Sequence, residues 1–175
     1  MRKIYIISGP TGVGKSTTSI RLAKQFDHSA YIEGDLINHM VIGGYLPPWE
    51  SEELEALVWE NIADLSINFL QANKHVIIDY VAFPKDLEMF SKRIHSELKN
   101  VEIIYVVLWT NPTELLRRDS LRSKEHQMGP RCLELINEFK SKGTDQRFIY
   151  DTSKLQASDF DEILLSIREN PAFKY

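Results

Sequence analysis

The sequence contains a single cysteine, Cys132, so the chain can form no internal disulfide. Proteins without disulfides are typical of the reducing cytoplasm, and we expect this protein to be cytoplasmic. No stretch approaches the roughly 20 apolar residues that a membrane-spanning helix requires. The apolar start of the chain, residues 4–7, is ended by Ser8-Gly9-Pro10, which is too early for a secretory signal.

The chain also lacks a large excess of one sign of charge. The formal net charge of -4 provides no global attraction to nucleic acid or to an anionic membrane. The five histidines and the cysteine lack zinc-ligand spacing, and Ser8-Gly9 lacks the nucleophile elbow of hydrolases. With 175 residues, 43% hydrophobic and 26% charged, and with no repeat or low-complexity linker, the chain (1–175) is expected to form one globular domain.

What the sequence does contain is a glycine-rich segment at residues 9–16, between an apolar run and a helix-like segment. Its spacing is that of the phosphate-binding loop, and a strand before it and a helix after it are the context that supports such a match. Glycines let successive backbone N–H groups turn toward an anion, and the helix adds its positive N-terminal end. The alternative is an ordinary glycine-rich turn. The combined features instead predict a site for a nucleoside triphosphate.

Within this loop, Lys15 can reach the β- and γ-phosphates, and the Ser16 hydroxyl can ligate Mg²⁺. The residues expected to contact the nucleotide here are Gly9, Pro10, Thr11, Gly12, Val13, Gly14, Lys15, Ser16 and Thr17.

Apolar strand-like runs alternate with longer helical segments along the chain. The strands are predicted at residues 3–8, 30–33, 75–79, 102–109 and 147–150, and the helices at 16–25, 50–72, 85–98, 112–118, 131–141 and 158–168. This alternation predicts an α/β fold with a central parallel sheet. Ligands bind such sheets beyond the carboxyl ends of the strands, so the residues that follow each strand are the candidates for function.

Two of these candidates are carboxylates. Asp35, after the second strand, can orient or deprotonate an attacking hydroxyl, and Glu33 is the weaker candidate. Asp35 could instead be the N-cap of a helix that starts at Leu36. Asp79 is the last residue of the third strand and is the second candidate for binding Mg²⁺, beside Ser16; it could hold the ion directly or through water. The alternative is that Asp79 is a helix cap or a turn residue.

A basic segment follows the fourth strand, and we predict that it forms a mobile lid at about residues 117–131. Its cations are Arg117, Arg118, Arg122, Lys124 and Arg131. Arg118 and Arg122 are four residues apart, so they share a helical face and can converge on phosphate or adenine. Phosphoryl transfer requires such cations, and lids exclude water during transfer. A solvated helical face is the alternative interpretation.

Two loops are weaker candidates. The loop with His39, Tyr45, Pro47, Pro48 and Trp49 can line an acceptor pocket, or it can be a packed connector. Thr152, within Asp151-Thr152-Ser153 after the last strand, can contact the nucleotide base; a helix-entry turn is the alternative.

These motifs together resemble those of the small P-loop kinases, which include gluconate, shikimate and adenylylsulfate kinases and chloramphenicol phosphotransferase. The resemblance covers nearly the whole chain. It implies a three-layer P-loop NTPase fold with a five-stranded parallel sheet, ATP with Mg²⁺, and phosphorylation of a hydroxyl on a small molecule. Asp35 matches the acidic position that contacts the acceptor in such kinases. Lys15, Arg118 and Arg122 would stabilise the transferring group.

Gluconate kinase is the most similar named member, and proteins labelled as gluconate kinases look like this chain. The shared residues are Gly34, Asp35, Gly44, Pro48, Trp49, Arg118, Arg122, His126 and Met128. In place of the usual His-Pro after Gly-Asp the chain has Ile37-Asn38, and an acidic-Arg cluster before Pro48 is missing. Asp79-Tyr80 looks closer to chloramphenicol phosphotransferase. A sugar acid or an antibiotic-like alcohol is therefore the expected acceptor.

Two other functions remain open. A P-loop ATPase or switch would act on a macromolecular partner, although the residues after Asp79 and around Asn73-Lys74 do not fit a GTPase. The basic lid also fits a kinase for a nucleic-acid end or for a nucleotide sugar, although a nucleic-acid partner is not expected from the overall charge. The sequence leaves the oligomeric state open.

Overall fold

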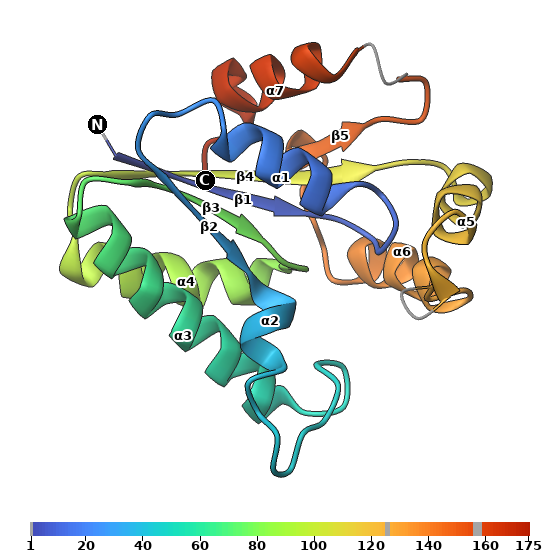
Figure 1. Cartoon of the computed structure of the whole chain (residues 1–175), viewed down its shortest axis with the longest axis horizontal. Coiled ribbons are helices and arrows are strands. Elements are labelled where there is room, and N and C mark those ends of the chain that lie inside the picture. Colours follow the sequence, from blue (N-terminus) through green and yellow to red (C-terminus); the bar gives the residue numbers. More distant parts are fainter. Residues whose placement is uncertain (1, 125–126, 156–158) are drawn as a thin grey trace.

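The computed structural model describes residues 2–124, 127–155 and 159–175, and it contains a five-stranded sheet in the order β2-β3-β1-β4-β5 (Figure 1). Every neighbouring pair of strands is parallel. The strands are β1 (Arg2–Ser8), β2 (Ser29–Glu33), β3 (His75–Asp79), β4 (Val101–Trp109) and β5 (Ile149–Asp151). The predicted α/β fold with its five parallel strands is confirmed. β5 begins later than predicted because η2 (Gln146–Phe148) forms a 3₁₀ turn there.

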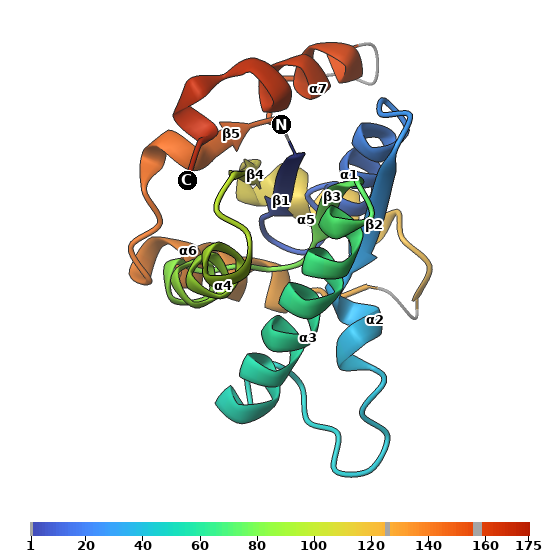
Figure 2. The ribbon, with the colours of Figure 1, turned by 90° about the vertical axis from the view of Figure 1, so that its left-hand side faces the viewer.

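Helices cover both faces of the sheet, with α1 and α7 on one face and α3 and α4 on the other (Figures 1 and 2). The helices are α1 (Lys15–Ala23), α2 (Gly34–Asn38), α3 (Glu52–Gln71), α4 (Pro84–Glu97), α5 (Pro112–Ser120), α6 (Arg131–Ser141) and α7 (Phe160–Glu169), and η4 (Pro171–Phe173) follows them. The six predicted helices correspond to six of these. α6 has the predicted bounds, the other five have shifted ends, and α2 is additional. Ser158, the predicted start of the last helix, lies outside the described residues. In the described part, no helix is long and apolar enough to cross a membrane.

The central strand β1 contributes to a core on each side of the sheet. Ile4 and Ile6 pack in the cluster that includes α3 and α4, whereas Tyr5 and Ile7 pack in the cluster that includes α1 and α7. All four side chains are almost completely buried. This is why β1 is apolar at successive positions rather than at alternate ones, as expected for a parallel strand covered on both faces.

The strand register brings the predicted functional segments together at one edge of the sheet. Asp79 of β3 pairs with Ile7 of β1 on one side and with Glu33 of β2 on the other. The phosphate loop leaves β1 directly after Ser8, and α2 begins directly after Glu33. The carboxyl ends of three neighbouring strands therefore open onto a common space.

The buried Gly34 at the start of α2 is required by close packing. A Cβ atom at this position would lie 2.3 Å from Cγ of Tyr80, well inside van der Waals contact. We expect Gly34→Ala to lower the free energy of unfolding by about 1–3 kcal/mol, the usual cost of overpacking. Thermal and urea denaturation would measure the loss. Gly43→Ala is the matched control, because a Cβ there meets no atom within 4 Å; equal stability of the two variants would contradict the prediction.

Candidate active site

A cavity of about 1370 Å³ lies at the carboxyl edge of the sheet, with the phosphate loop on one side and the α2–α3 connection on the other. The predicted site residues that line it are Thr11, Gly12, Gly14, Lys15, Ser16, Thr17, Asp35, Asp79 and Arg122. Four residues proposed as acceptor contacts from the sequence, His39, Tyr45, Pro48 and Trp49, line it as well. The fold thus collects segments from across the chain around one space.

The phosphate loop has the backbone conformation that its glycines allow. Gly9, Gly12 and Gly14 have φ values of 133°, 88° and 109°, which side-chain-bearing residues rarely adopt. At Gly9, a Cβ atom would lie 2.3 Å from the carbonyl oxygen of Leu108 in β4. Gly9 itself does not line the cavity; it lets the loop leave β1 against the neighbouring strand.

Lys15, the first residue of α1, bends back over the loop. Its Nζ donates hydrogen bonds to the carbonyl oxygens of Gly9 (3.0 Å) and Pro10 (3.2 Å). Burial lowers the pKa of Lys15, and the carboxylates of Asp79 and Asp35 counteract that shift. The ammonium group therefore lies over the loop, where it can exchange its carbonyl partners for phosphate oxygens.

Asp79 and Ser16 face the same cavity from the end of β3 and the start of α1. Asp79 is 4% exposed, and its Oδ2 accepts a hydrogen bond from the hydroxyl of Tyr31 at 2.9 Å. The N-cap of the next helix, α4, is Phe83, so Asp79 is not a helix cap. Hydroxyl and carboxylate oxygens are the donors that Mg²⁺ prefers, and the pair fits that ion chemically.

Asp35 lies in the first turn of α2, where it faces the cavity. The N-cap of α2 is Glu33, so the alternative that Asp35 caps a helix starting at Leu36 is wrong. Burial raises the pKa of Asp35, nearby Lys15 lowers it, and Asp79 raises it. A carboxylate with a raised pKa is a stronger base than an ordinary aspartate, and this one lies within the field of the loop lysine.

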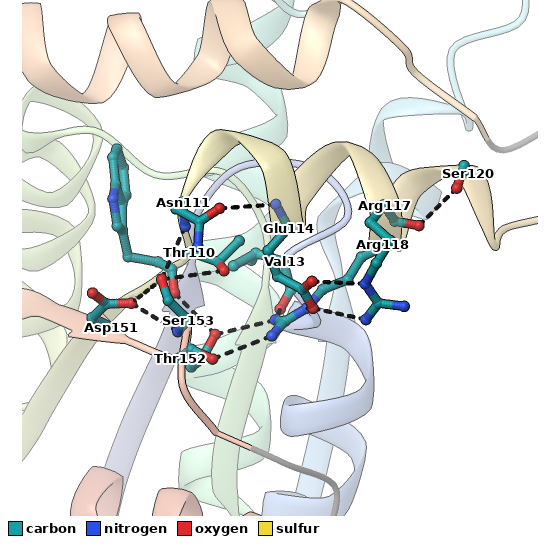
Figure 3. Close-up of polar contacts among 11 residues, drawn as sticks. Val13, Thr110, Asn111, Glu114, Arg117, Arg118, Ser120, Asp151, Thr152 and Ser153 are labelled. Atoms are coloured by element: carbon teal, nitrogen blue, oxygen red, sulfur yellow. Dashed lines mark hydrogen bonds and ion pairs between the residues drawn. The ribbon is translucent and has the colours of Figure 1, made fainter.

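Arg118 of α5 connects three segments at the outer side of the loop (Figure 3). Its Nη1 donates to the carbonyl oxygen of Val13 and to Oγ1 of Thr152, both at 3.1 Å, and its Nη2 donates to the Thr152 carbonyl oxygen at 3.2 Å. Its Nε donates to Glu114 at 2.8 Å. Arg118 and Thr152, which were both predicted to contact the nucleotide, are therefore in contact with each other. Neither residue lines the cavity.

The predicted lid runs from the end of α5 to the start of α6. Arg122 lines the cavity, and its Nη1 lies 3.3 Å from Oδ1 of Asp119. Arg117 does not line the cavity. Its side chain is exposed and pairs with Glu114, as expected for a solvated helical face. Residues 125 and 126 lie outside the described residues, so the structure describes the lid at 117–124 and 127–131, and His126 is not described.

Asp119 is a site residue that the sequence did not reveal. It is 3% exposed, and its carboxylate accepts hydrogen bonds from the backbone N–H groups of Met128 (3.0 Å) and Gly129 (2.8 Å) in addition to the Arg122 contact. The Asp119 carboxylate therefore links the side chain of Arg122 to the backbone of Met128 and Gly129, near the start of α6. In the sequence it stands as one acidic residue within a basic run, and nothing there indicates burial.

Several polar residues of the cavity wall were not predicted as site residues, among them Asn38, Glu55, Tyr80 and Asp86. They come from α2, α3, the residue after β3, and α4. Asn38 and Tyr80 had a weak sequence signal, because Asn38 lies where gluconate kinases have His-Pro and Tyr80 directly follows Asp79.

The sheet order, the phosphate loop after β1 and the carboxylates at the ends of β2 and β3 define a nucleotide-binding protein of the P-loop kinase class. The sequence profile of the AAA_18 family, described as "AAA domain", matches residues 6–137. The chain belongs to this family, a family of P-loop kinases.

Solved structures share the fold over nearly the full length. An unliganded sugar kinase from Janibacter sp. HTCC2649 is 14% identical with a TM-score of 0.68, covering 98% of this chain and 96% of the kinase. A gluconokinase from Sinorhizobium meliloti 1021 is 14% identical with a TM-score of 0.64, covering 95% and 91%. The APS kinase CysC of Mycobacterium tuberculosis, solved with AMPPNP and APS, is 14% identical with a TM-score of 0.64, covering 96% and 98%. No curated protein matches the sequence.

Proposed function

We propose that this protein transfers the γ-phosphoryl group of ATP to a hydroxyl of a small molecule in the cytoplasm. One observation carries the proposal: the loop lysine Lys15, the carboxylate of Asp35 and the lid cation Arg122 line a single cavity. A phosphate-binding group, a base and a second cation are the parts that phosphoryl transfer requires.

The mechanism follows from the position of each side chain. The backbone N–H groups of the phosphate loop and Lys15 hold the β- and γ-phosphates. Asp35 accepts the proton of the acceptor hydroxyl as its oxygen attacks the γ-phosphorus, and the β–γ bridging oxygen leaves with ADP. Arg122 stabilises the negative charge on the group in transit.

Ser16 and Asp79 would hold Mg²⁺, Ser16 directly and Asp79 through water. When bound, Mg²⁺ neutralises charge on the phosphate oxygens. Asp79 is held for this role by the hydroxyl of Tyr31, which occupies part of its hydrogen-bonding capacity and orients the carboxylate.

The two lid arginines are expected to have different roles. Arg118 is engaged with Val13, Glu114 and Thr152, which suits a positioning role at the nucleotide end of the loop. Arg122 faces the cavity, and its carboxylate partner among the described residues is Asp119. We therefore expect Arg122→Ala to lower kcat by about 10²–10³-fold, the usual effect of removing one transition-state donor. Arg118→Ala should mainly raise the KM for ATP. Steady-state kinetics that varied ATP and acceptor separately would distinguish them, and identical changes in both variants would contradict the division of roles.

The proposal is tested by incubating the protein with γ-labelled ATP, Mg²⁺ and a panel of hydroxylated metabolites and antibiotics, gluconate included. Formation of a labelled product, lost in the Lys15→Ala variant, is the expected result. Binding of ATP without transfer to any alcohol, together with partner binding that differs between ATP and ADP, would instead identify a nucleotide switch. Phosphorylation of oligonucleotide ends, with salt-sensitive binding, would identify a nucleic-acid kinase.

A further inference from the structure

The half of the cavity that lies away from the phosphate loop is lined by carboxylates and aromatic rings. Glu55 of α3 and Asp86 of α4 belong to this wall, as do Tyr45, Trp49 and Tyr80. Lys85, Arg131 and Lys142 also line this wall, and the phosphate half contains Lys15 and Arg122 beside Asp35 and Asp79. What an acceptor would meet in the far half therefore depends on which of its carboxylates have a cation partner in the protein.

Glu55 has no side-chain hydrogen bond or ion pair among the described residues. Burial raises the pKa of Glu55 to about 7, with further contributions from the neighbouring carboxylates of Asp86 and Glu138; Lys142 and Lys85 oppose the shift. Keeping a half-buried carboxyl without a partner is unfavourable unless a ligand supplies one.

The cations on the same wall already have partners within the chain. Lys85 pairs with Glu52 at 3.3 Å, and Lys142 lies 3.5 Å from Glu138 with its ammonium over the ring of Phe83. Arg131 pairs with Glu134 and Glu138. In the described part of the wall, each of these cations thus has a carboxylate partner in the protein, with which an acceptor carboxylate would compete.

Two deeply buried polar groups of the wall also lack a hydrogen-bond partner among the described residues: the hydroxyl of Tyr80, in a residue that is 4% exposed, and Oδ1 of Asn38, in a residue that is 2% exposed. Oδ1 of Asn38 can only accept a hydrogen bond. A donor-rich ligand would satisfy these acceptors.

The aromatic rings strengthen the same conclusion. The guanidinium of Arg131 stacks on Trp49 at 4.7 Å from the ring centroid, so this wall already accommodates a cation against an aromatic face. Tyr45 and Trp49 are partly exposed within the cavity lining. Carboxylates combined with aromatic faces bind ammonium groups in particular.

We propose that the phosphoryl acceptor is an amino alcohol, whose protonated amine is bound by Glu55, Asp86 and the Tyr80 hydroxyl while its own hydroxyl faces Asp35. This assignment rests on the proposed phosphotransferase function. It separates the chain from kinases of sugar acids, because a carboxylate-bearing acceptor would meet Glu55 and Asp86, and it disfavours polynucleotide ends for the same reason.

The test uses acceptors that share a scaffold and differ in charge, namely glucosamine, glucose and gluconate, and further amino alcohols that are each paired with their deaminated analogue. Among acceptors that are turned over, the amine-bearing member should have a kcat/KM about tenfold or more above its uncharged partner, as expected for a charge-assisted hydrogen bond. For amino alcohols whose amine has a pKa well above 8, the advantage should grow between about pH 6 and about pH 8, because Glu55 loses its proton in that range while the amine keeps its own. Glucosamine is left out of this pH series, because its amine loses its own proton near the upper end of the range.

Glu55→Gln should raise the KM of the amine-bearing acceptor about tenfold or more with little change in kcat, and should abolish the advantage over the uncharged partner. Glu53→Gln is the matched control, because Glu53 lies in the same helical turn, is exposed and does not line the cavity. Preference for gluconate or glucose, or a KM unaffected by Glu55→Gln, would overturn the inference while leaving the kinase function intact.

If no acceptor is turned over, the inference is tested by the binding of amino alcohols, measured as a change in Tm. With AMPPNP and Mg²⁺ present, amino alcohols should raise the Tm of the wild type and of Glu53→Gln more than their deaminated analogues do, and should not do so for Glu55→Gln. Equal shifts for charged and uncharged members would overturn the inference. Selective binding of amino alcohols without transfer would support the assigned ligand and contradict the phosphotransferase function instead.

Discussion

Replacing Lys15 by alanine is expected to lower kcat for phosphoryl transfer by about 10²–10³-fold. Nζ of Lys15 lies over the loop at 3.0 Å from the Gly9 carbonyl, and Asp35 and Asp79 surround it with negative charge. When phosphates enter, this ammonium lies directly over the loop backbone and inside the cavity. Without it, the loop N–H groups alone must stabilise the growing charge, and the two carboxylates become repulsive toward phosphate.

The measurement is steady-state kinetics together with ATP binding and thermal denaturation. Lys24→Ala is the control, because Lys24 follows the last turn of the same helix, α1, and does not line the cavity. Lys15→Ala should remain folded, since the hydrogen bonds of the Lys15 ammonium in the described part of the structure go to carbonyl oxygens of its own loop. Turnover of Lys15→Ala close to that of the wild type would exclude the proposed mechanism.

The Asp35→Asn variant is expected to lose about 10²–10⁴-fold in kcat, the range for removing a general base. The amide keeps the volume of the carboxylate but cannot accept the proton of the acceptor hydroxyl. In the wild type, Asp35 works as a base only above its pKa, which burial raises above the usual aspartate value. The rate should therefore fall as the pH decreases, with a midpoint above that of an exposed aspartate, and this acidic limb should be absent in Asp35→Asn.

Rates measured across pH with saturating ATP and a turned-over acceptor would test this role. Asp27→Asn provides a control at a carboxylate outside the cavity. An Asp35→Asn variant with unchanged kcat and a raised KM for the acceptor would show that Asp35 binds the acceptor rather than removing its proton.

The strands and the phosphate loop were predictable because their signals are local. The apolar run from Ile4 to Ile7 and the glycines that follow encode strand and loop within a dozen residues, and the fold confirms the α/β prediction. The helix α2 was not predicted: it has only five residues, too few for a helical period to show. For the same reason Asp35 could be read as a cap, although it lies inside that helix.

Burial and pairing were not predictable. Asp119 stands among arginines, and only the folded chain shows that its carboxylate binds the N–H groups of Met128 and Gly129 from within the protein. Arg118 and Arg122 look equivalent at four residues apart, but the end of α5 lies between them, so one contacts Thr152 and the other faces the cavity.

The sequence by itself determined the fold class and the identity of the loop, because hydrophobic periodicity and the demand for positive φ at Gly12 and Gly14 are properties of neighbouring residues. Only the tertiary structure decided which polar residues line the part of the cavity that we propose for the acceptor. Glu55, Tyr80 and Asp86 come from separate elements, and it is the packing of α3 and α4 against β3 that brings them together. It also shields them from water, partly for Glu55 and almost completely for Tyr80 and Asp86, and a shielded polar group is stable only with a hydrogen-bond partner.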